Sequence, residues 1–225
     1  MAIQAILTDI EGTTTDIDFV HKTLFPYAAS HLPRFVAENA NDASVASIID
    51  DVRGEMGNLD ASIDDVIEAC LTWIDADKKV TPLKALQGLI WVKGYQQGDF
   101  TGHLYHDAIT YLQGWHEQGI ALYVFSSGSV KAQKLLFGYS DAGDLTGLFS
   151  GYFDTTTGHK REEASYEAIA AAIGVPAPEV LFLSDVEEEL DAAAAAGMKT
   201  TLLARDELPA RSSHTVVESF DEIDL

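Results

Sequence analysis

An acidic turn that could perform phosphoryl transfer begins at Asp9, directly after the apolar run Ala5-Ile6-Leu7. Glu11 follows two residues later, and Gly12 with the threonines behind it can form a tight polar turn. A free carboxylate such as Asp9 can attack phosphorus without a general base, and hard metal ions prefer carboxylate oxygens. The pattern therefore predicts a nucleophilic aspartate beside a metal ion. The alternative is an ordinary acidic turn after a strand, because short motifs recur by chance.

Further polar side chains stand at the ends of other apolar runs, or shortly after them. They are Ser126 with Ser127, Lys160, and Asp185. The carboxyl ends of parallel strands meet at one edge of an open sheet, where the ligands of such folds bind. We therefore expect these side chains to converge with Asp9 on a single site. Their convergence is more specific than any one of them.

Each of these side chains has a chemical role and an ordinary alternative. Ser126 and Ser127 could bind phosphoryl oxygens through hydroxyl and backbone N–H groups at a helix N-terminus. The alternative is ordinary capping of that helix by Ser127 or Ser129. Lys160 would neutralise charge on a phosphoryl group and on Asp9, although a loop lysine is usually solvated. Asp185 would hold a hard cation together with Asp9, or would serve only as a helix N-cap.

The elements that must position these residues alternate between strand and helix. Short apolar or β-branched runs predict strands buried on both faces, at residues 3–8, 120–126, 148–154, 180–184 and 199–204. Helical patterns separate most of them, at residues 106–118, 130–137, 162–173 and 187–196. This alternation predicts an α/β fold with a doubly wound, Rossmann-like parallel sheet.

Residues 16–100 interrupt the alternation and contain no convincing strand. Helices are expected there at residues 20–39, 44–56, 62–76 and 82–96. Thr81-Pro82 suits a helix start, because threonine caps well and proline tolerates the first helical position. We therefore expect a catalytic core of residues 1–15 and 101–225, with an all-helical domain of residues 16–100 inserted after the first strand.

The composition limits the partners of the protein. The net charge is -22, with only 14 lysines and arginines among 225 residues. This balance argues against nucleic acid and against anionic membrane surfaces, which require basic patches. A small phosphate substrate would also be repelled by the overall field. A bound cation and a few well-placed lysines would have to reverse that field locally.

The single cysteine and the hydropathy pattern bear on the compartment. Cys70 has no intrachain partner for a disulfide, which fits a reducing cytoplasm. Gln4 and Asp9 interrupt the apolar N-terminal segment, so it does not look like a signal peptide. No run is long and apolar enough to span a membrane. We expect a cytoplasmic protein.

The order of the polar motifs resembles the haloacid-dehalogenase superfamily of aspartate-nucleophile phosphatases, and the helical insert looks like the cap of that superfamily. Several longer stretches narrow the resemblance to the enolase-phosphatases of methionine salvage, also called acireductone synthases. These stretches are 9–14, 81–91, 126–138 and 149–155. The resemblance covers nearly the whole chain and is weakest after about Arg205.

The resemblance implies a monomeric enzyme that uses one Mg²⁺. It would convert 2,3-diketo-5-methylthiopentyl-1-phosphate into 1,2-dihydroxy-3-keto-5-methylthiopentene and free phosphate. By the same resemblance Asp9, Glu11 and Lys160 are catalytic. Ser126, Ser127 and Lys160 would bind substrate. Asp9, Glu11 and Asp185 would hold the metal, Glu11 through its main-chain carbonyl.

Glu11 stands where the superfamily usually has a second aspartate that serves as general acid and base. Because its main-chain carbonyl would ligate the metal, its side chain would be left to move the proton in enolisation. A solvated turn acid is the alternative. Glu189 matches the second acid of the superfamily's fourth motif and could support the site, or could only favour the helix dipole.

Substrate selectivity would come from the helical insert. Tyr27, Trp73, Trp91 and Tyr95 could line an apolar pocket for a methylthio group, with Lys84 and Lys93 as further candidates, although aromatic residues at helical spacing are more often core. The nearest alternative function is a capped phosphatase for another small phosphate, without an enolase step. A phospho-accepting signalling domain and a pure binding module fit the motifs less well.

Overall fold

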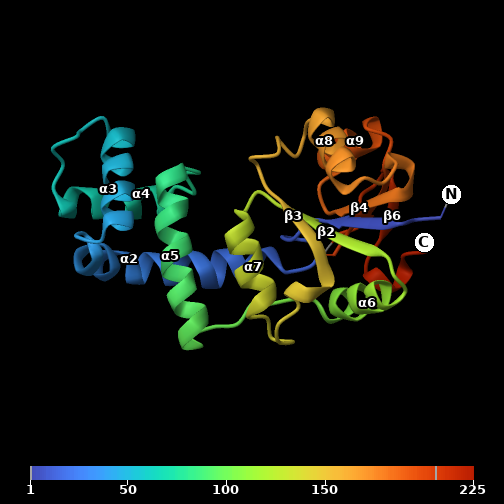
Figure 1. Cartoon of the computed structure of the whole chain (residues 1–225), viewed down its shortest axis with the longest axis horizontal. Helices are drawn as coiled ribbons and strands as arrows, with labels where there is room; N and C mark the ends of the chain where they lie inside the picture. Colours follow the sequence, from blue (N-terminus) through green and yellow to red (C-terminus); the bar gives the residue numbers. More distant parts are fainter. Residues whose placement is uncertain (1, 206) are drawn as a thin grey trace. The chain divides into compact units, whose positions relative to one another are not determined.

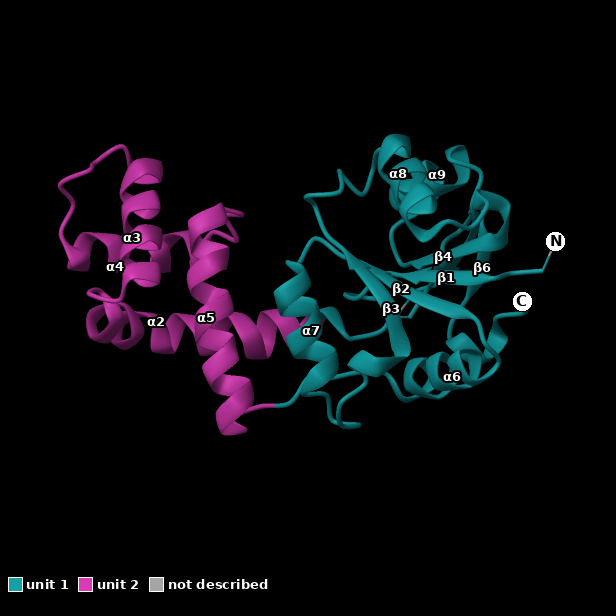
Figure 2. Cartoon of the chain, in the orientation of Figure 1, with its two compact units in different colours: residues 1–17, 101–225 teal, residues 18–100 magenta. Residues whose placement is uncertain are grey.

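The computed structural model of the chain describes residues 2–205 and 207–225 (Figure 1). The chain divides into two compact units (Figure 2). The first unit consists of Met1–Ile17 and Thr101–Leu225, and the second of Asp18–Phe100. Among the described residues, no helix has the length and apolar character needed to cross a membrane.

The first unit is built on a parallel sheet with the strand order β3-β2-β1-β4-β5-β6. The strands are β1 (Ala5–Thr8), β2 (Ala121–Phe125), β3 (Phe149–Phe153), β4 (Val180–Ser184), β5 (Lys199–Leu203) and β6 (Thr215–Val217). The doubly wound α/β fold predicted from the sequence is confirmed. The short strand β6 was not expected, because its residues do not form a continuous apolar run and are only partly buried.

The register of the sheet brings the ends of its central strands together. Thr8, the last residue of β1, pairs with Val124 of β2 on one side and with Leu183 of β4 on the other. The chain proceeds outward in both directions from this centre, so the carboxyl end of β1 is a topological switch point, where doubly wound folds bind ligands. Residues that follow β1, β2 and β4 are therefore held near one another.

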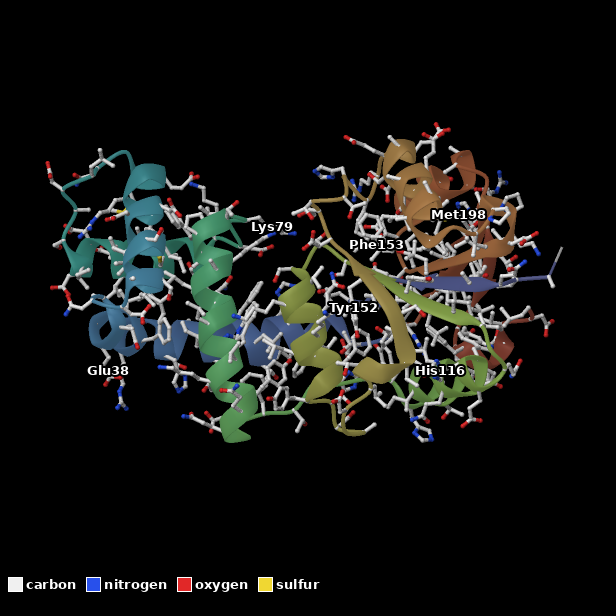
Figure 3. All side chains as sticks on the ribbon, in the orientation of Figure 1. Glu38, Lys79, His116, Tyr152, Phe153 and Met198 are labelled. Atoms are coloured by element: carbon white, nitrogen blue, oxygen red, sulfur yellow. The ribbon has the colours of Figure 1, made fainter. Side chains whose placement is uncertain are left out.

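Helices cover both faces of this sheet, with α8 and α9 together on one face and α6 on the other (Figure 1). The α-helices are α6 (His106–Glu117), α7 (Val130–Gly138), α8 (Glu163–Ile173) and α9 (Glu187–Ala195), and the 3₁₀ turns are η2 (Thr146–Leu148), η3 (Ala177–Glu179) and η4 (Phe220–Glu222). The apolar cluster beneath α8 and α9 includes Tyr166, Phe182 and Met198, with Phe153 packed against it. Met198 and Phe153 are labelled in Figure 3. Burial of these large side chains fixes the helices on the sheet.

The second unit is entirely helical. It comprises α1 (Ile17–Phe19), whose first residue belongs to the first unit, the π-helix η1 (Val20–Leu24), α2 (Phe25–Asn39), α3 (Ala43–Met56), α4 (Ile63–Asp75) and α5 (Thr81–Gln97). The sequence predicted one continuous α-helix over residues 20–39, and the π-helical turn corrects that prediction. The turn ends at Leu24, two residues before Pro26, which lacks the N–H that a regular helix would require.

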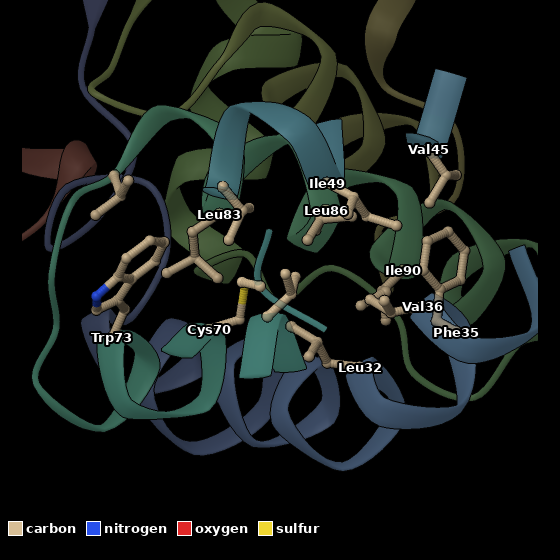
Figure 4. Close-up of a cluster of buried hydrophobic side chains, with 14 residues drawn as sticks. Leu32, Phe35, Val36, Val45, Ile49, Cys70, Trp73, Leu83, Leu86 and Ile90 are labelled. Carbon is tan, nitrogen blue, oxygen red and sulfur yellow. The ribbon is translucent and has the colours of Figure 1, made fainter. Parts of the chain in front are cut away.

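Helix caps and an apolar core define the second unit. Asp42 caps α3 by accepting from the backbone N–H groups of Ser44 and Val45, and Ser62 forms a capping box with Asp65 at α4. The core between the helices is drawn in Figure 4 and contains Leu32, Phe35, Val36, Val45, Ile49, Cys70, Trp73, Leu83, Leu86 and Ile90 among others.

The aromatic residues considered for a substrate pocket take part in packing within the second unit. Trp73 belongs to the buried core, and Tyr95 is buried against the ring of Phe100. The indole N–H of Trp91 donates to the carbonyl of Leu24 at 2.9 Å. For Trp73 and Tyr95, these contacts favour the core interpretation over a ligand-binding one.

Candidate active site

Asp9 occupies the position directly after β1 and is almost completely buried, with 3% of its surface exposed. Its backbone N–H donates to the carbonyl of Leu183 at 2.9 Å, which extends the pairing with β4 by one residue. Its Oδ1 atom accepts from the backbone N–H of Ile10 at 2.7 Å. The sheet and the following turn therefore fix the predicted nucleophile in place.

Lys160 reaches the carboxylate of Asp9 from the loop between β3 and α8. Its Nζ atom lies 2.7 Å from Asp9 Oδ1 and 2.5 Å from Glu189 Oε2. Burial disfavours the charged form of Lys160, but the carboxylates of Asp9 and Glu189 outweigh it and raise the pKa of the ammonium above its ordinary value. The lysine is thus a buried, permanent cation beside Asp9, and not a solvated loop residue.

The loop that carries Lys160 is held by hydrogen bonds to α8. The hydroxyl of Tyr166 donates to the carbonyl of Lys160 at 2.6 Å, and the hydroxyl of Ser165 donates to the carbonyl of His159 at 2.7 Å. Gly158 lies so close to Ser165 that a Cβ atom would stand 2.2 Å from its hydroxyl oxygen. Gly158, two residues before the lysine, therefore lets the loop approach α8 and turn Lys160 inward.

Ser184 and Glu189 complete the buried network. The hydroxyl of Ser184 can donate to Glu189 Oε2 at 3.1 Å or to Asp9 Oδ2 at 3.4 Å, and it accepts from the N–H of Val186. Burial, followed by the charge of Asp9, raises the pKa of Glu189 to about 7. Ser184 was missed by sequence reasoning because the last residue of a buried strand shows no distinctive pattern.

Glu11 lies in the turn after Asp9, and its side chain points to the end of β2. Its Oε2 atom accepts from the hydroxyl of Ser126 at 3.1 Å. Burial, followed by the charge of Asp9, raises the pKa of the Glu11 carboxyl, which increases its affinity for a proton. Ser126 is fully buried and also accepts from the N–H of Gly128 at 3.0 Å. The two predicted residues are therefore directly connected.

The remaining serines after β2 differ in their surroundings. Ser127 is exposed, and its role in substrate binding stays a prediction. Ser129 caps α7, since its hydroxyl accepts from the N–H of Ala132. Gln133 braces the loop by donating to the carbonyls of Gly128 and Phe153, at 2.8 Å each. The serine loop is therefore fixed by a buried amide as well as by its helix cap.

Asp185 follows β4 and lies against the turn that contains Gly12. A Cβ atom on Gly12 would stand 2.2 Å from Asp185 Oδ2, and the φ angle of Gly12 is +75°. The hydroxyl of Thr13 donates to Asp185 Oδ1 at 3.3 Å. Asp185 is partly exposed to solvent. Burial of its carboxylate group, followed by the negative charge of Asp9, nevertheless raises its pKa to about 6. Asp185 does not cap α9, whose N-cap residue is Val186.

The oxygen donors at this edge of the sheet fit a hard cation. Among the described residues, no group of three His, Cys, Asp or Glu side chains is arranged to hold a metal ion. The predicted ligand set requires only two carboxylates, those of Asp9 and Asp185, with the main-chain carbonyl of Glu11. Burial is the main cause of the raised pKa values of Glu11 and Asp185, and the negative charge of Asp9 adds to it. A divalent cation would offset that negative charge.

Comparisons with known proteins agree with this fold and site. Residues 3–197 match the family of haloacid dehalogenase-like hydrolases, and the chain belongs to that family. It also matches curated proteins named enolase-phosphatase E1. One from Pseudomonas aeruginosa (strain LESB58) is 58% identical over 223 residues, covering 99% of both chains. Another from Serratia proteamaculans (strain 568) is 57% identical, covering 99% of this chain and 97% of the relative. The chain is thus a member of the enolase-phosphatase E1 family.

Solved structures support the same fold. The UTR4 protein of Saccharomyces cerevisiae superposes with a TM-score of 0.84 at 36% identity, covering 98% of this chain and 100% of that chain. CbbY of Rhodobacter sphaeroides, solved with phosphate, has a TM-score of 0.59 at 17% identity, over 98% of this chain and 96% of that chain. At that identity the second likeness concerns the fold alone.

Proposed function

We propose that the protein is a Mg²⁺-dependent bifunctional enolase-phosphatase of methionine salvage. Its substrate would be 2,3-diketo-5-methylthiopentyl-1-phosphate, and its products 1,2-dihydroxy-3-keto-5-methylthiopentene and phosphate. The observation that carries the proposal is the pairing of two acids in one turn. Asp9 is held at 2.7 Å by Lys160, while Glu11 is oriented separately by Ser126.

In the enolase half-reaction, the side chain of Glu11 removes the proton from C1 of the diketo phosphate. Burial and the neighbouring charge of Asp9 raise the pKa of Glu11, so that it is a stronger base than an exposed glutamate. The hydroxyl of Ser126 holds one of its oxygens and so limits the directions in which the carboxylate can point. Loss of this proton leaves an enolate, and its oxygen takes a proton back from Glu11 to give the enol phosphate.

In the phosphatase half-reaction, the carboxylate of Asp9 forms a bond to phosphorus while the bond from phosphorus to the C1 oxygen breaks. That oxygen takes up a proton and becomes the second hydroxyl of the product. Water then attacks the aspartyl-phosphate, which releases phosphate and restores Asp9. The ammonium of Lys160 stabilises the added negative charge on the phosphoryl oxygens. The serine loop after β2 would supply hydroxyl and N–H donors to the same oxygens.

The metal would be held by the carboxylates of Asp9 and Asp185 and by the main-chain carbonyl of Glu11. When bound, Mg²⁺ supplies Lewis-acid polarisation of the substrate's carbonyl and phosphoryl oxygens. Glu189 is bonded to Lys160 and Ser184 and would act through those partners. One Mg²⁺ per chain is part of the proposal.

The remaining expectations belong to the same proposal. We infer that a helical domain of residues 16–100 serves as the cap, as the resemblance implies for an insert after the first strand. The enzyme would act as a cytoplasmic monomer on a small phosphate, without nucleic acid or membrane partners. The net charge of -22 and the single, buried Cys70 support this inference.

The decisive test follows the diketo phosphate by ultraviolet absorbance while phosphate release is measured in the same sample. The proposal expects the absorbance of an enol intermediate or product together with phosphate. Release of phosphate with the diketone left unenolised would instead support the second candidate, a capped phosphatase without enolase activity. The full-length relatives named enolase-phosphatase E1 favour the first candidate.

A further inference from the structure

Arg205 lies two residues beyond the end of β5 and is nearly buried, with 10% of its side chain exposed. Its Nη1 atom lies 2.7 Å from Asp107 Oδ2, which also accepts from the N–H of Phe220 at 2.8 Å. The guanidinium stands 4.2 Å from the centre of the Tyr105 ring. Segments outside the site described above therefore hold one side of the guanidinium.

The other donors of this guanidinium are directed at the turn that follows Asp9. Both Nη2 and Nε donate to the carbonyl of Thr13, at 2.8 and 3.3 Å. The hydroxyl of the same threonine donates to Asp185. The turn borders a pocket of about 280 Å³, lined among others by Gly12, Asp185 and Arg205. Arg205 therefore holds the turn at the edge of this pocket.

We propose that Arg205 is a positioning residue for the enolase-phosphatase reaction. By holding the Thr13 carbonyl, it fixes the main chain two residues after Glu11 and the hydroxyl that orients Asp185. This inference rests on the proposed function. The planar guanidinium can bond Asp107 and Thr13 at once through separate donors, whereas the point charge of a lysine cannot reproduce that fork.

A matched pair of variants separates this role from that of a structural ion pair. Arg205→Lys keeps the charge beside Asp107 but loses the fork to Thr13. Asp107→Asn weakens the ion pair but keeps an oxygen that accepts from Phe220 and leaves the arginine donors in place. We expect kcat to fall about tenfold to a hundredfold in Arg205→Lys with KM changed less than about threefold, and to stay near the parent in Asp107→Asn. Equal losses in both variants would overturn the proposal.

Two further measurements apply to the same protein. Guanidinium ion at non-denaturing concentration should restore part of the kcat of Arg205→Ala, whereas ammonium should not. Hydrogen exchange of the amides at residues 10–16 should be faster in Arg205→Lys, with the sheet strands unchanged. Hydrogen exchange is measured without substrate. It therefore tests the positioning role of Arg205 even if the parent protein does not enolise the diketo phosphate. Unchanged exchange in the turn would contradict the proposal, as would equal rescue by both cations.

Discussion

The ammonium of Lys160 lies 2.7 Å from Oδ1 of Asp9, and both side chains are almost excluded from solvent. Lys160 also contacts Glu189, so one cation serves two buried carboxylates. This relationship answers the problem that the composition poses. In a chain with a net charge of -22, an attacking aspartate and an anionic phosphate can meet only where the field is reversed locally.

Replacement of Lys160 by methionine should impair both activity and folding. Phosphate release should fall about 10²- to 10³-fold, because stabilisation of the phosphoryl charge is lost. The free energy of unfolding should fall by about 3–5 kcal/mol, because Asp9 and Glu189 stay buried without their cation. Steady-state kinetics and urea denaturation measure the two effects. Replacement of the exposed Lys131 on α7 by methionine is the control. Phosphate release by Lys160→Met within threefold of the parent rate would disprove the role of Lys160.

The sequence was sufficient for the fold class and for the convergence of Asp9, Lys160 and Asp185. Strands that are buried on both faces appear in the sequence as continuous apolar runs. Parallel pairing of these strands brings the residues that follow them to one edge of the sheet. Ser184 and Arg205 could not be found in this way. Ser184 ends a buried strand, and Arg205 acts through a main-chain carbonyl, a contact that constrains no particular residue type at its partner position.

Glu11→Gln should separate the two half-reactions. The amide keeps an oxygen that can accept from Ser126, so the turn should hold its conformation while the base is lost. Exchange of the substrate's C1 proton with solvent deuterium, followed by NMR, should slow about 10²- to 10⁴-fold. Phosphate release from a non-enolisable ester should be affected less. Glu188→Gln, on the exposed surface of α9, serves as the control. Proton exchange at the parent rate in Glu11→Gln would exclude Glu11 as the base.

Gly12→Ala should displace Asp185. The added methyl group would stand 2.2 Å from Oδ2, and the backbone at φ +75° disfavours any side chain. We expect a higher Mg²⁺ concentration for half-maximal activity and a kcat lowered about tenfold to a hundredfold. Gly114→Ala, in α6 where nothing lies within 4 Å, is the matched control. A parent-like Mg²⁺ dependence in Gly12→Ala would mean that Asp185 does not serve the metal.

The cap of α3 should make the stability of the helical unit depend on pH. Hydrogen bonds from the Ser44 hydroxyl, and then from the N–H groups of Ser44 and Val45, lower the pKa of Asp42 below its ordinary 3.8. Because the pKa of Asp42 is lower in the folded state, ionisation of Asp42 stabilises that state at pH values above its ordinary pKa. This stabilisation is lost as the pH falls through the lowered pKa.

Asp42→Ala should therefore reduce the melting temperature by about a few degrees at pH 7, with the difference shrinking towards pH 2. Circular dichroism melts of the full chain measure this effect. Asp51→Ala, on the exposed surface of the same helix, should show no such dependence. A difference between parent and Asp42→Ala that persists at pH 2 would argue that the aspartate acts by packing and not as a charged cap.

The central claim is that Asp9 transfers phosphate while a different acid, Glu11, enolises the substrate. The most direct test incubates Asp9→Asn with the diketo phosphate at saturating Mg²⁺ and follows ultraviolet absorbance together with ³¹P NMR. We expect the enol phosphate to accumulate, phosphate release to fall about 10⁴-fold or more, and the circular dichroism spectrum to match the parent. Phosphate release at a tenth of the parent rate would contradict the account.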